Sequence, residues 1–500
     1  MRRRPPGWHT FVVIAGMIGC APSEAPSVSP VPVAVANASA PDLVLLLPSG
    51  LRADPPGAPG PEAQFIEALG IGALGEPTQR FTAAYAQSAA TYVSLGSIFT
   101  GRYPTSIPLC GLFTDGVSAV ETRTVQGNAL ANRLWCADIP ASVPTLPEVL
   151  ALYGYRTAYA VAGVPGAAGL ARGFAEVETV PFDADTGTDW PALARWAGAW
   201  WSANADAPRL LVVTTADLQL VDRPAVLDRM GIRLMLGETV PLPDPARSDA
   251  DPAEVARIYG DVAHAAGAGL ATVVDALEST PGREAPNRES RARWVFAAAT
   301  NGVSLIETSG FFQMAVPVAS TSYMLDRTAR VPLLVYAPPG GAGRGGESRR
   351  IVELLDLVPT LTNLAGAVAP ARLPGVDLFA GPVSGTGDEY AYAEFGDTLL
   401  YRKGDHEVLF RAYLHHGTVL DPQLDERLRD GTNHKYFTVH DVQRDPWQRD
   451  NLVFSRSDLF QALRTGLTRV RTGPAAPPPG TWDDPQRLWE IRMARSHGYW

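Results

Sequence analysis

The sequence predicts an α/β fold in which a mostly parallel central sheet carries helices on both faces. Short uninterrupted apolar runs recur along the chain, as they do in strands that are buried on both faces of a parallel sheet. Segments with helical spacing of apolar residues separate these runs, and strands that alternate with helices form sheets covered on both sides. Hydrophobic residues make up 46% of the 500 residues, which excludes a wholly disordered chain.

The apolar runs and the periodic segments give the expected elements in chain order. The predicted strands are Asp42–Leu47, Leu210–Val213, Trp294–Ala298 and Val331–Tyr336. The predicted helices are Val143–Leu152, Trp190–Trp201, Ala253–Leu277 and Leu354–Leu364.

A stretch rich in Pro, Gly and Ser near residues 381–387 interrupts this pattern. The alternating segments after it, such as Tyr390–Phe395 and Tyr436–Val442, predict a short antiparallel sheet. We therefore expect a main domain over residues 41–380. A smaller C-terminal α+β subdomain is expected over residues 381–500, ending in a tail.

The N-terminus has the features of a bacterial export signal. Three arginines precede a short apolar run, Phe11–Gly19, and this order is typical of a signal peptide. The run ends at Cys20, and Met17–Cys20 resembles the lipobox of bacterial lipoproteins, in which the cysteine becomes the lipidated N-terminus. A plain secretory signal with an incidental cysteine is the alternative.

These features predict a lipid-anchored protein of the bacterial cell envelope. Residues 1–19 are the expected signal peptide, and residues 20–40, rich in Ala, Pro and Ser, are the expected flexible tether. Ala21 rather than an aspartate follows the cysteine, which by the sorting rule of lipoproteins favours the outer membrane. No later run approaches the ~20 apolar residues that a membrane-spanning helix needs.

The net charge limits the classes of partner, and the cysteine content limits the possible disulfides. The formal net charge is −10, and Lys403 and Lys435 are the only lysines, so a nucleic-acid partner is excluded. Besides Cys20 the chain has Cys110 and Cys136. An oxidising envelope favours a disulfide between them, and two buried free thiols are the alternative.

Seven segments resemble, in the same order, the motifs of the sulfatase family. DLVLLLPSGLRAD resembles the family's opening strand, of the form NVVLILVDDLRAD, and TYVSLGSIFTGRYP resembles its nucleophile helix, of the form CSPSRASLLTGRYP. The resemblance covers about residues 41–455 and implies the alkaline-phosphatase-like α/β sandwich. The seven segments are Asp42–Asp54, Thr91–Pro104, Val143–Thr157, Ala299–Gly302, Ala329–Pro332, Leu355–Gly366 and His440–Leu452.

The same resemblance implies a catalytic site, but the residues that carry out the family's chemistry are replaced in this chain. The formylglycine nucleophile, made from Cys or Ser, falls on Thr91. The signal that directs its formation is lost, because Val93 and Leu95 replace the family's Pro and Arg. The metal ligands, which are carboxylates in the family, fall on Ser49, Gly50, Thr300 and Asn301.

The family's lysines and histidines have no counterparts at the site. The lysine and histidine after residues 154–157 would fall near Ala162 and Val164, and the histidine of the central strand near Thr214 or Thr215. We therefore expect no cofactor, and Ca²⁺ or Mg²⁺ only if the chain is an active enzyme.

Other residues that match the family's motifs are predicted to stabilise the fold. Arg52 and Asp54 keep the family's LRAD shape. Gly101 is expected to form a backbone turn and Arg102 to pair with a carboxylate. We expect Thr91 to pack against, or to cap, the helix that follows it. His415 and His416, with Asp405, His406 and Glu407, form a titratable cluster that is interpreted as structural, and a metal site is the alternative.

The sequence therefore predicts a degenerate member of the sulfatase family. Its expected role is that of a pseudoenzyme binding a glycan, an anionic small molecule or a protein partner. One alternative is an active sulfuric-ester or phosphoric-ester hydrolase that uses Thr91 in a rebuilt site. The other is a surface scaffold lipoprotein without a ligand.

Overall fold

The fold is described from a computed structural model. The structure describes residues 40–55, 60–107, 110–113, 133–136, 139–140, 142–164, 170–220, 223–231, 251–278, 291–303, 305, 324–341, 345–380, 389–395, 398–411, 428–429 and 434–472, with the backbone alone at 110–113 and 133–136. The expected signal peptide, Cys20, most of the tether, and His415 and His416 of the titratable cluster lie outside these residues. Within them, no helix is long and apolar enough to cross a membrane.

An eight-stranded sheet forms the centre of the molecule. Seven strands run parallel to one another, and β11 is antiparallel to both of its neighbours, so the predicted mostly parallel sheet is confirmed. Its strands, in spatial order, are β12 (Gly346–Glu353), β2 (Gln79–Tyr85), β11 (Arg330–Tyr336), β10 (Arg293–Ala298), β1 (Asp42–Pro48), β9 (Arg209–Thr215), β5 (Arg156–Ala162) and β6 (Glu176–Val180).

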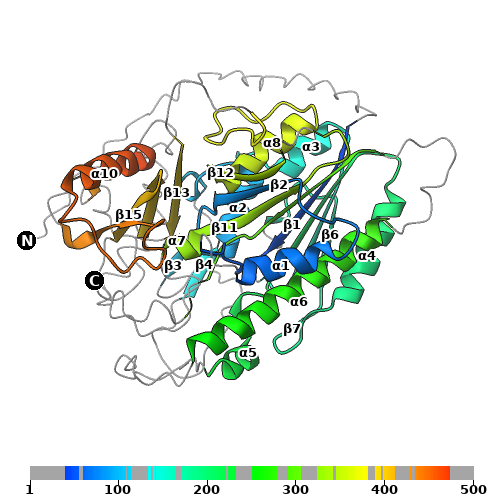
Figure 1. Cartoon of the computed structure of the whole chain (residues 1–500). Coiled ribbons are helices and arrows are strands. Elements are labelled where there is room, and N and C mark those ends of the chain that lie inside the picture. Colours follow the sequence, from blue (N-terminus) through cyan, green and yellow to red (C-terminus); the bar gives the residue numbers. More distant parts are fainter. Residues whose placement is uncertain are drawn as a thin grey trace, which may run out of the picture. The chain divides into compact units, whose positions relative to one another are not determined.

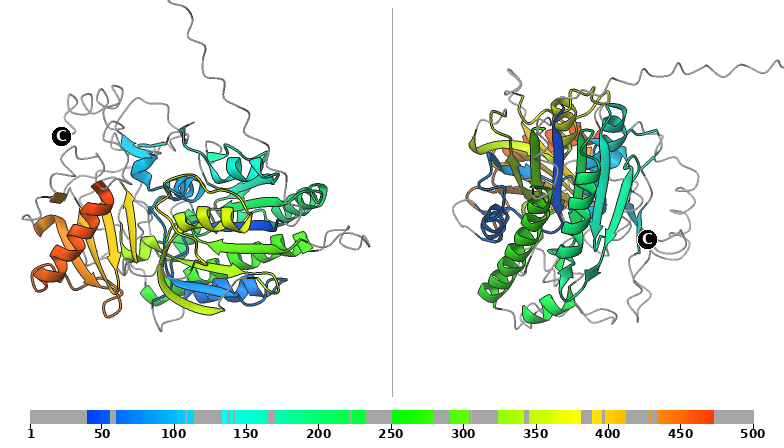
Figure 2. Two further views of the ribbon diagram at one scale, coloured as in Figure 1. Left: turned by 90° about the horizontal axis from the view of Figure 1, so that it is seen from above. Right: turned by 90° about the vertical axis from the view of Figure 1, so that its right-hand side faces the viewer.

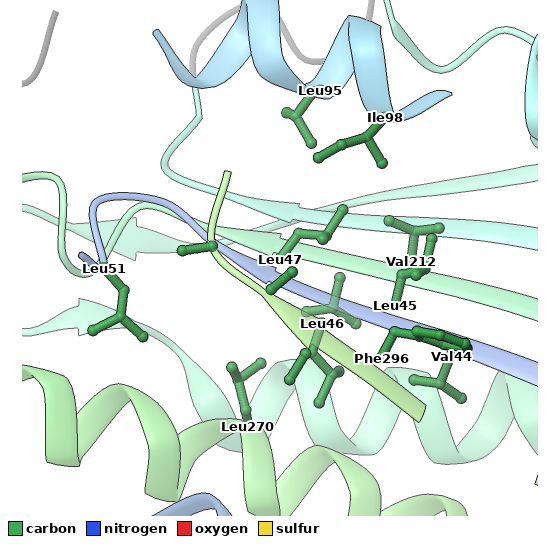
Figure 3. Close-up of a cluster of buried hydrophobic side chains, with 14 of the residues drawn as sticks. Val44, Leu45, Leu46, Leu47, Leu51, Leu95, Ile98, Val212, Leu270 and Phe296 are labelled. Carbon is green, nitrogen blue, oxygen red and sulfur yellow. The ribbon is translucent and has the colours of Figure 1, made fainter. Parts of the chain in front are cut away.

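Helices cover both faces of this sheet, as predicted (Figure 1). One face carries α1 (Pro61–Gly70), α4 (Trp190–Ala203) and α6 (Pro252–Glu278). The other carries α2 (Thr91–Thr100), α3 (Leu146–Leu152) and α8 (Leu357–Leu364). Figure 3 shows how the two layers close on the strands: Leu95 and Ile98 of α2 lie on one side of β1, and Leu270 of α6 lies on the other.

The central strand β1 explains why the sheet needs two covering layers. Every residue of its sequence DLVLLLP is buried, because a strand with apolar side chains on both faces excludes water from both. Asp42, at its start, is a buried carboxylate that accepts hydrogen bonds from Arg209 N and Arg209 Nε at 3.0 and 3.1 Å. This ion pair fixes β9 beside β1.

A second, four-stranded antiparallel sheet lies in the C-terminal part, as predicted (Figure 2). It consists of β13 (Tyr390–Phe395), β14 (Thr398–Lys403), β15 (His406–Arg411) and β16 (Phe437–Asp441) in that order, and α10 (Ser457–Thr472) packs on β14 and β15. The remaining elements are β3 (Cys110–Phe113), β4 (Arg133–Cys136), β7 (Phe182–Asp183), β8 (Gly187–Thr188), α5 (Pro224–Arg229), α7 (Asp326–Ala329) and three short 3₁₀ turns, Pro104–Ser106, Leu354–Asp356 and His434–Tyr436.

A buried charged network joins the second sheet to the first. Asp326 of α7 accepts hydrogen bonds from the Tyr85 hydroxyl at 2.6 Å and from Arg330 Nε at 2.7 Å. Arg402 of β14 lies within 3.4 Å of the same carboxylate and donates to the Tyr85 hydroxyl at 2.5 Å. The network therefore links β2, β11 and β14.

Candidate functional site

The candidate site lies where the parallel strands end. In open α/β sheets, ligands bind outside the carboxyl ends of the strands. Here Ser49 follows β1, Gln219 lies in the turn after β9, and Asn301 follows β10. Thr91 opens α2, which begins shortly after β2 ends at the same edge of the sheet. Four segments distant in sequence therefore converge at one point.

Their side chains form one hydrogen-bonded group, which we call the hydroxyl–amide cluster: Ser49, Thr91, Gln219, Thr300 and Asn301. Thr91 Oγ1 lies 3.0 Å from Ser49 Oγ and 2.9 Å from both Gln219 Oε1 and Asn301 Oδ1. Ser49 Oγ donates to Gln219 Oε1 at 2.7 Å, and Thr300 Oγ1 donates to Asn301 Oδ1 at 2.9 Å. Gln219 is the member that is half-buried, and the other four are buried.

The backbone at position 50 excludes the second aspartate that the resemblance implies there. Gly50 has φ +87°, and a Cβ on it would lie 2.3 Å from the carbonyl oxygen of Leu218. Gly50 N also donates to Asn301 O at 3.0 Å, and Gly50 O accepts from the Tyr259 hydroxyl at 2.6 Å. A glycine is therefore required both by the positive φ and by the close approach.

The cluster does not fit a tightly held Ca²⁺ or Mg²⁺. These ions need several hard oxygen ligands, usually with carboxylates among them. The cluster offers only neutral hydroxyl and carboxamide groups, whose polar atoms already face one another. Across the part of the chain that the structure describes, no group of three or more His, Cys, Asp or Glu side chains could hold a metal ion.

Comparison with solved structures identifies the fold. The chain matches a protein from Bacteroides thetaiotaomicron VPI-5482 assigned to the sulfatases, with a TM-score of 0.58, 17% identity and coverage of 86% of this chain and 92% of that chain. It matches a 2-O GAG sulfatase with a TM-score of 0.56, 17% identity and coverage of 87% and 92%. The fold is that of the sulfatases.

A third match is a structure in complex with its substrate, D-glucosamine-2-N,6-O-disulfate. Its TM-score is 0.53 at 14% identity, and the match covers 87% of this chain and 99% of that chain. No protein-family model matches the sequence, and no curated protein matches it. At these identities the similarity establishes a sulfatase-like fold, as the sequence motifs predicted.

Two of the predicted fold-holding residues have that role in this sulfatase fold. The Asp54 carboxylate accepts hydrogen bonds from the backbone N–H groups of Gly60, Glu62 and Ala63 at 2.6, 3.1 and 3.0 Å, so it caps the first turn of α1. Gly101 ends α2 in the left-handed region with φ +66°. Both predictions are confirmed.

One other prediction is wrong, and another is confirmed in one of its two alternatives. Thr91 packs in the interior, since it is buried, but it does not cap α2, because the N-cap is Ala90 without a side-chain hydrogen bond and the Thr91 hydroxyl belongs to the cluster. Arg102 donates to the backbone oxygen of Ala371 at 3.4 Å, and among the described residues no carboxylate pairs with it. A backbone carbonyl of the loop after α8 therefore takes the place of the expected carboxylate.

Aromatic rings and guanidinium groups meet next to the cluster. Arg52 Cζ lies 5.7 Å from the centroid of the Tyr259 ring and 5.9 Å from that of Trp447. Arg327 Cζ lies 5.1 Å from the Trp447 centroid, and Arg327 Nη2 donates to Trp447 O at 2.7 Å. Gly302 touches both arginines, since a Cβ on it would lie 2.1 Å from Arg327 O and 3.1 Å from Arg52 Cβ. Two arginines therefore flank the residue that follows Asn301 in the chain.

Sequence reasoning missed Gln219. The family's histidine was sought at Thr214 or Thr215, which are buried within β9, and the residue that enters the site comes from the turn beyond the strand. Gln219 belongs to no motif. Its signal in the sequence is its position just after an apolar strand, where the carboxyl edge of the sheet begins.

Proposed function

We propose that this chain is a sulfatase-like protein that binds a glycan or another anionic ligand without hydrolysing it. The observation that carries the proposal is the hydroxyl–amide cluster, whose members other than Gln219 fall, by the motif resemblance, on the family's nucleophile and metal-ligand positions. Sulfate-ester cleavage needs an activated nucleophile, stabilisation of the transferring anion and a proton for the leaving group. The cluster supplies none of these from a carboxylate, a histidine or a lysine.

The ligand class is supported by charge and by the structural neighbours. Arg52 and Arg327 flank Gly302, the residue after Asn301, through Arg52 Cβ and Arg327 O, and the guanidinium group of Arg is well suited to sulfate and carboxylate groups. One similar structure holds a disulfated glucosamine, and another, with a TM-score of 0.56 and 15% identity, holds k-i-k-neocarrahexaose. A sulfated oligosaccharide is therefore the first ligand to test.

The deciding experiment measures binding and turnover on the same protein. Isothermal titration with sulfated carrageenan and glucosamine oligosaccharides should give saturable binding, and ion chromatography should detect no released sulfate. Thr91→Val is the matched variant, because it removes the hydroxyl and keeps the shape of the side chain. It should leave the absence of sulfate release unchanged. Sulfate release that is lost in Thr91→Val would favour the hydrolase, and absence of binding to all oligosaccharides would favour a scaffold.

We further propose that lipidated Cys20 anchors the protein in the bacterial envelope, in the outer membrane. The basic n-region, the short apolar run and the lipobox-like Met17–Cys20 support this placement. Cells fed labelled palmitate should incorporate it into the wild type and not into Cys20→Ser. Equal labelling of both proteins would overturn the anchor, and fractionation with the inner membrane would overturn the assignment to the outer one.

A further inference from the structure

We infer that the turn after β9, residues 216–220, is a built-in replacement for the ion at this site, with the Gln219 carboxamide as the bridging group. An ion held by ligands from several strands ties their ends together. In this chain a side chain makes those connections. The inference concerns how the site is held together, so it stands independently of any ligand.

The turn is fixed in place from several sides. Ala216 N donates to Ala162 O of β5 at 3.0 Å, and Gln219 N donates to Ala216 O at 2.9 Å. The Asp217 carboxylate accepts from Thr188 N at 3.0 Å and from the Thr188 hydroxyl at 2.5 Å. Leu218 and Leu220 are buried in the main core. The position of Gln219 is therefore set by its neighbours rather than by the cluster alone.

From this position the turn enters the space that the family's ligand residues surround. Gln219 Oε1 lies 2.7 Å from Ser49 Oγ and 2.9 Å from Thr91 Oγ1. The carbonyl of Leu218 lies where a side chain at Gly50 would begin. The turn therefore contacts two of the four metal-ligand positions and the nucleophile position, and Thr91 extends the connection to Asn301 at 2.9 Å.

Two consequences follow. First, the end of the sheet holds together without a divalent ion, so its stability is independent of Ca²⁺ and Mg²⁺. Second, an aspartate cannot be restored at position 50 by substitution alone. The space beside Gly50 is filled by backbone atoms of the turn, which cannot move aside as a flexible side chain could. The backbone of the turn, as well as the side chains of the cluster, therefore accounts for the loss of the ion.

Thermal unfolding of the full chain tests the inference. The midpoint of the wild type should be the same in EDTA, CaCl₂ and MgCl₂. Gln219→Ala should lower it by roughly 2 °C or more, since the variant leaves buried hydroxyls without a partner. Gln443→Ala is the matched control, because Gln443 is exposed and its side chain makes no hydrogen bond to the described residues; its midpoint should not change.

Three results would overturn the inference: a rise in the wild-type midpoint with CaCl₂ or MgCl₂, a fall in EDTA, or equal midpoints for Gln219→Ala and Gln443→Ala. These readouts are separate from ligand binding. Ion-independent unfolding combined with failure to bind oligosaccharides would reject the proposed function and support the replacement of the ion.

Discussion

Thr91 Oγ1 and Asn301 Oδ1 lie 2.9 Å apart although 210 residues separate them in the chain. By the motif resemblance, Thr91 falls on the family's nucleophile position and Asn301 on one of its metal-ligand positions. In this chain both are neutral and buried, and they are joined by a direct hydrogen bond. The start of α2 and the segment after β10 therefore contact each other directly through these two side chains.

Removing the Thr91 hydroxyl should weaken this contact without emptying the space. We expect Thr91→Val to lower the free energy of unfolding by about 1–2 kcal/mol, because the variant leaves buried amide and hydroxyl oxygens with one fewer partner. Thr91→Ser keeps the hydroxyl and should lose less. Urea denaturation of the three proteins measures the difference, and equal stability of Thr91→Val and the wild type would show that the hydrogen bonds contribute nothing.

Asp54 should stabilise the start of α1, although the residues before it are not the metal-binding aspartates that the resemblance implies. Asp54→Ala leaves three N–H groups of the first turn without their acceptor, and we expect a loss of about 1–2 kcal/mol in the free energy of unfolding. Glu67→Gln, on an exposed position of the same helix, is the control and should change little. The prediction fails if the two variants unfold at the same urea concentration.

The buried Glu353 should make stability depend on pH. Its carboxyl accepts hydrogen bonds from the Tyr103 hydroxyl and from Tyr392 N, both at 2.8 Å. Burial, and secondly the neighbouring Asp356 carboxylate, raises the pKa of Glu353 from 4.5 to about 8. The folded state therefore holds this proton more tightly than the unfolded chain. The stabilisation that the protonated Glu353 carboxyl contributes is complete below pH of about 4.5 and is lost as the pH rises through about 8.

The measurement is the urea midpoint at a series of pH values through that window. The wild type should lose stability as the pH rises, and Glu353→Gln, which stays neutral, should show a flatter profile. Glu347→Gln on the same strand is the control, since Glu347 is exposed, and it should follow the wild type. Parallel profiles for wild type and Glu353→Gln would contradict the assignment.

The expected disulfide gains support from the backbone. Strands β3 and β4 are antiparallel, and their register places Cys110 directly opposite Cys136. Opposed residues in such a pair have Cα atoms about 4.5–5.5 Å apart, within the range that a disulfide spans. Thiol labelling of unreduced, unfolded protein exported to the envelope should find neither cysteine reactive, and labelling of both would show two free thiols.

Much of the main sheet could be predicted because its central strands are continuous apolar runs. Strands β1, β9, β10 and β11 contain the predicted segments, and in each of them nearly every residue is buried. Strand β2 was not predicted. Its sequence QRFTAAY mixes polar and apolar residues, and its first half alternates between buried and half-buried positions, so no uninterrupted apolar run marks it.

The site was predicted in part, and for a different reason. Thr91, Ser49, Thr300 and Asn301 were found through motif positions, and the structure brings all four together. Gln219 was not found, because its partners Ser49 and Thr91 lie 170 and 128 residues away. A contact of this kind leaves no local pattern in the sequence, and only the path of the turn after β9 produces it.

The charged network around Asp326 limits how this protein can change over evolution or be rebuilt in the laboratory. Asp326 belongs to α7, Arg330 to β11 of the main sheet and Arg402 to β14 of the second sheet, and all three are buried. A chimera that takes its C-terminal part from a relative lacking this arginine would leave a carboxylate in the protein interior with one of its two guanidinium partners missing. The two sheets are therefore inherited as a unit, and the C-terminal part is not an exchangeable module.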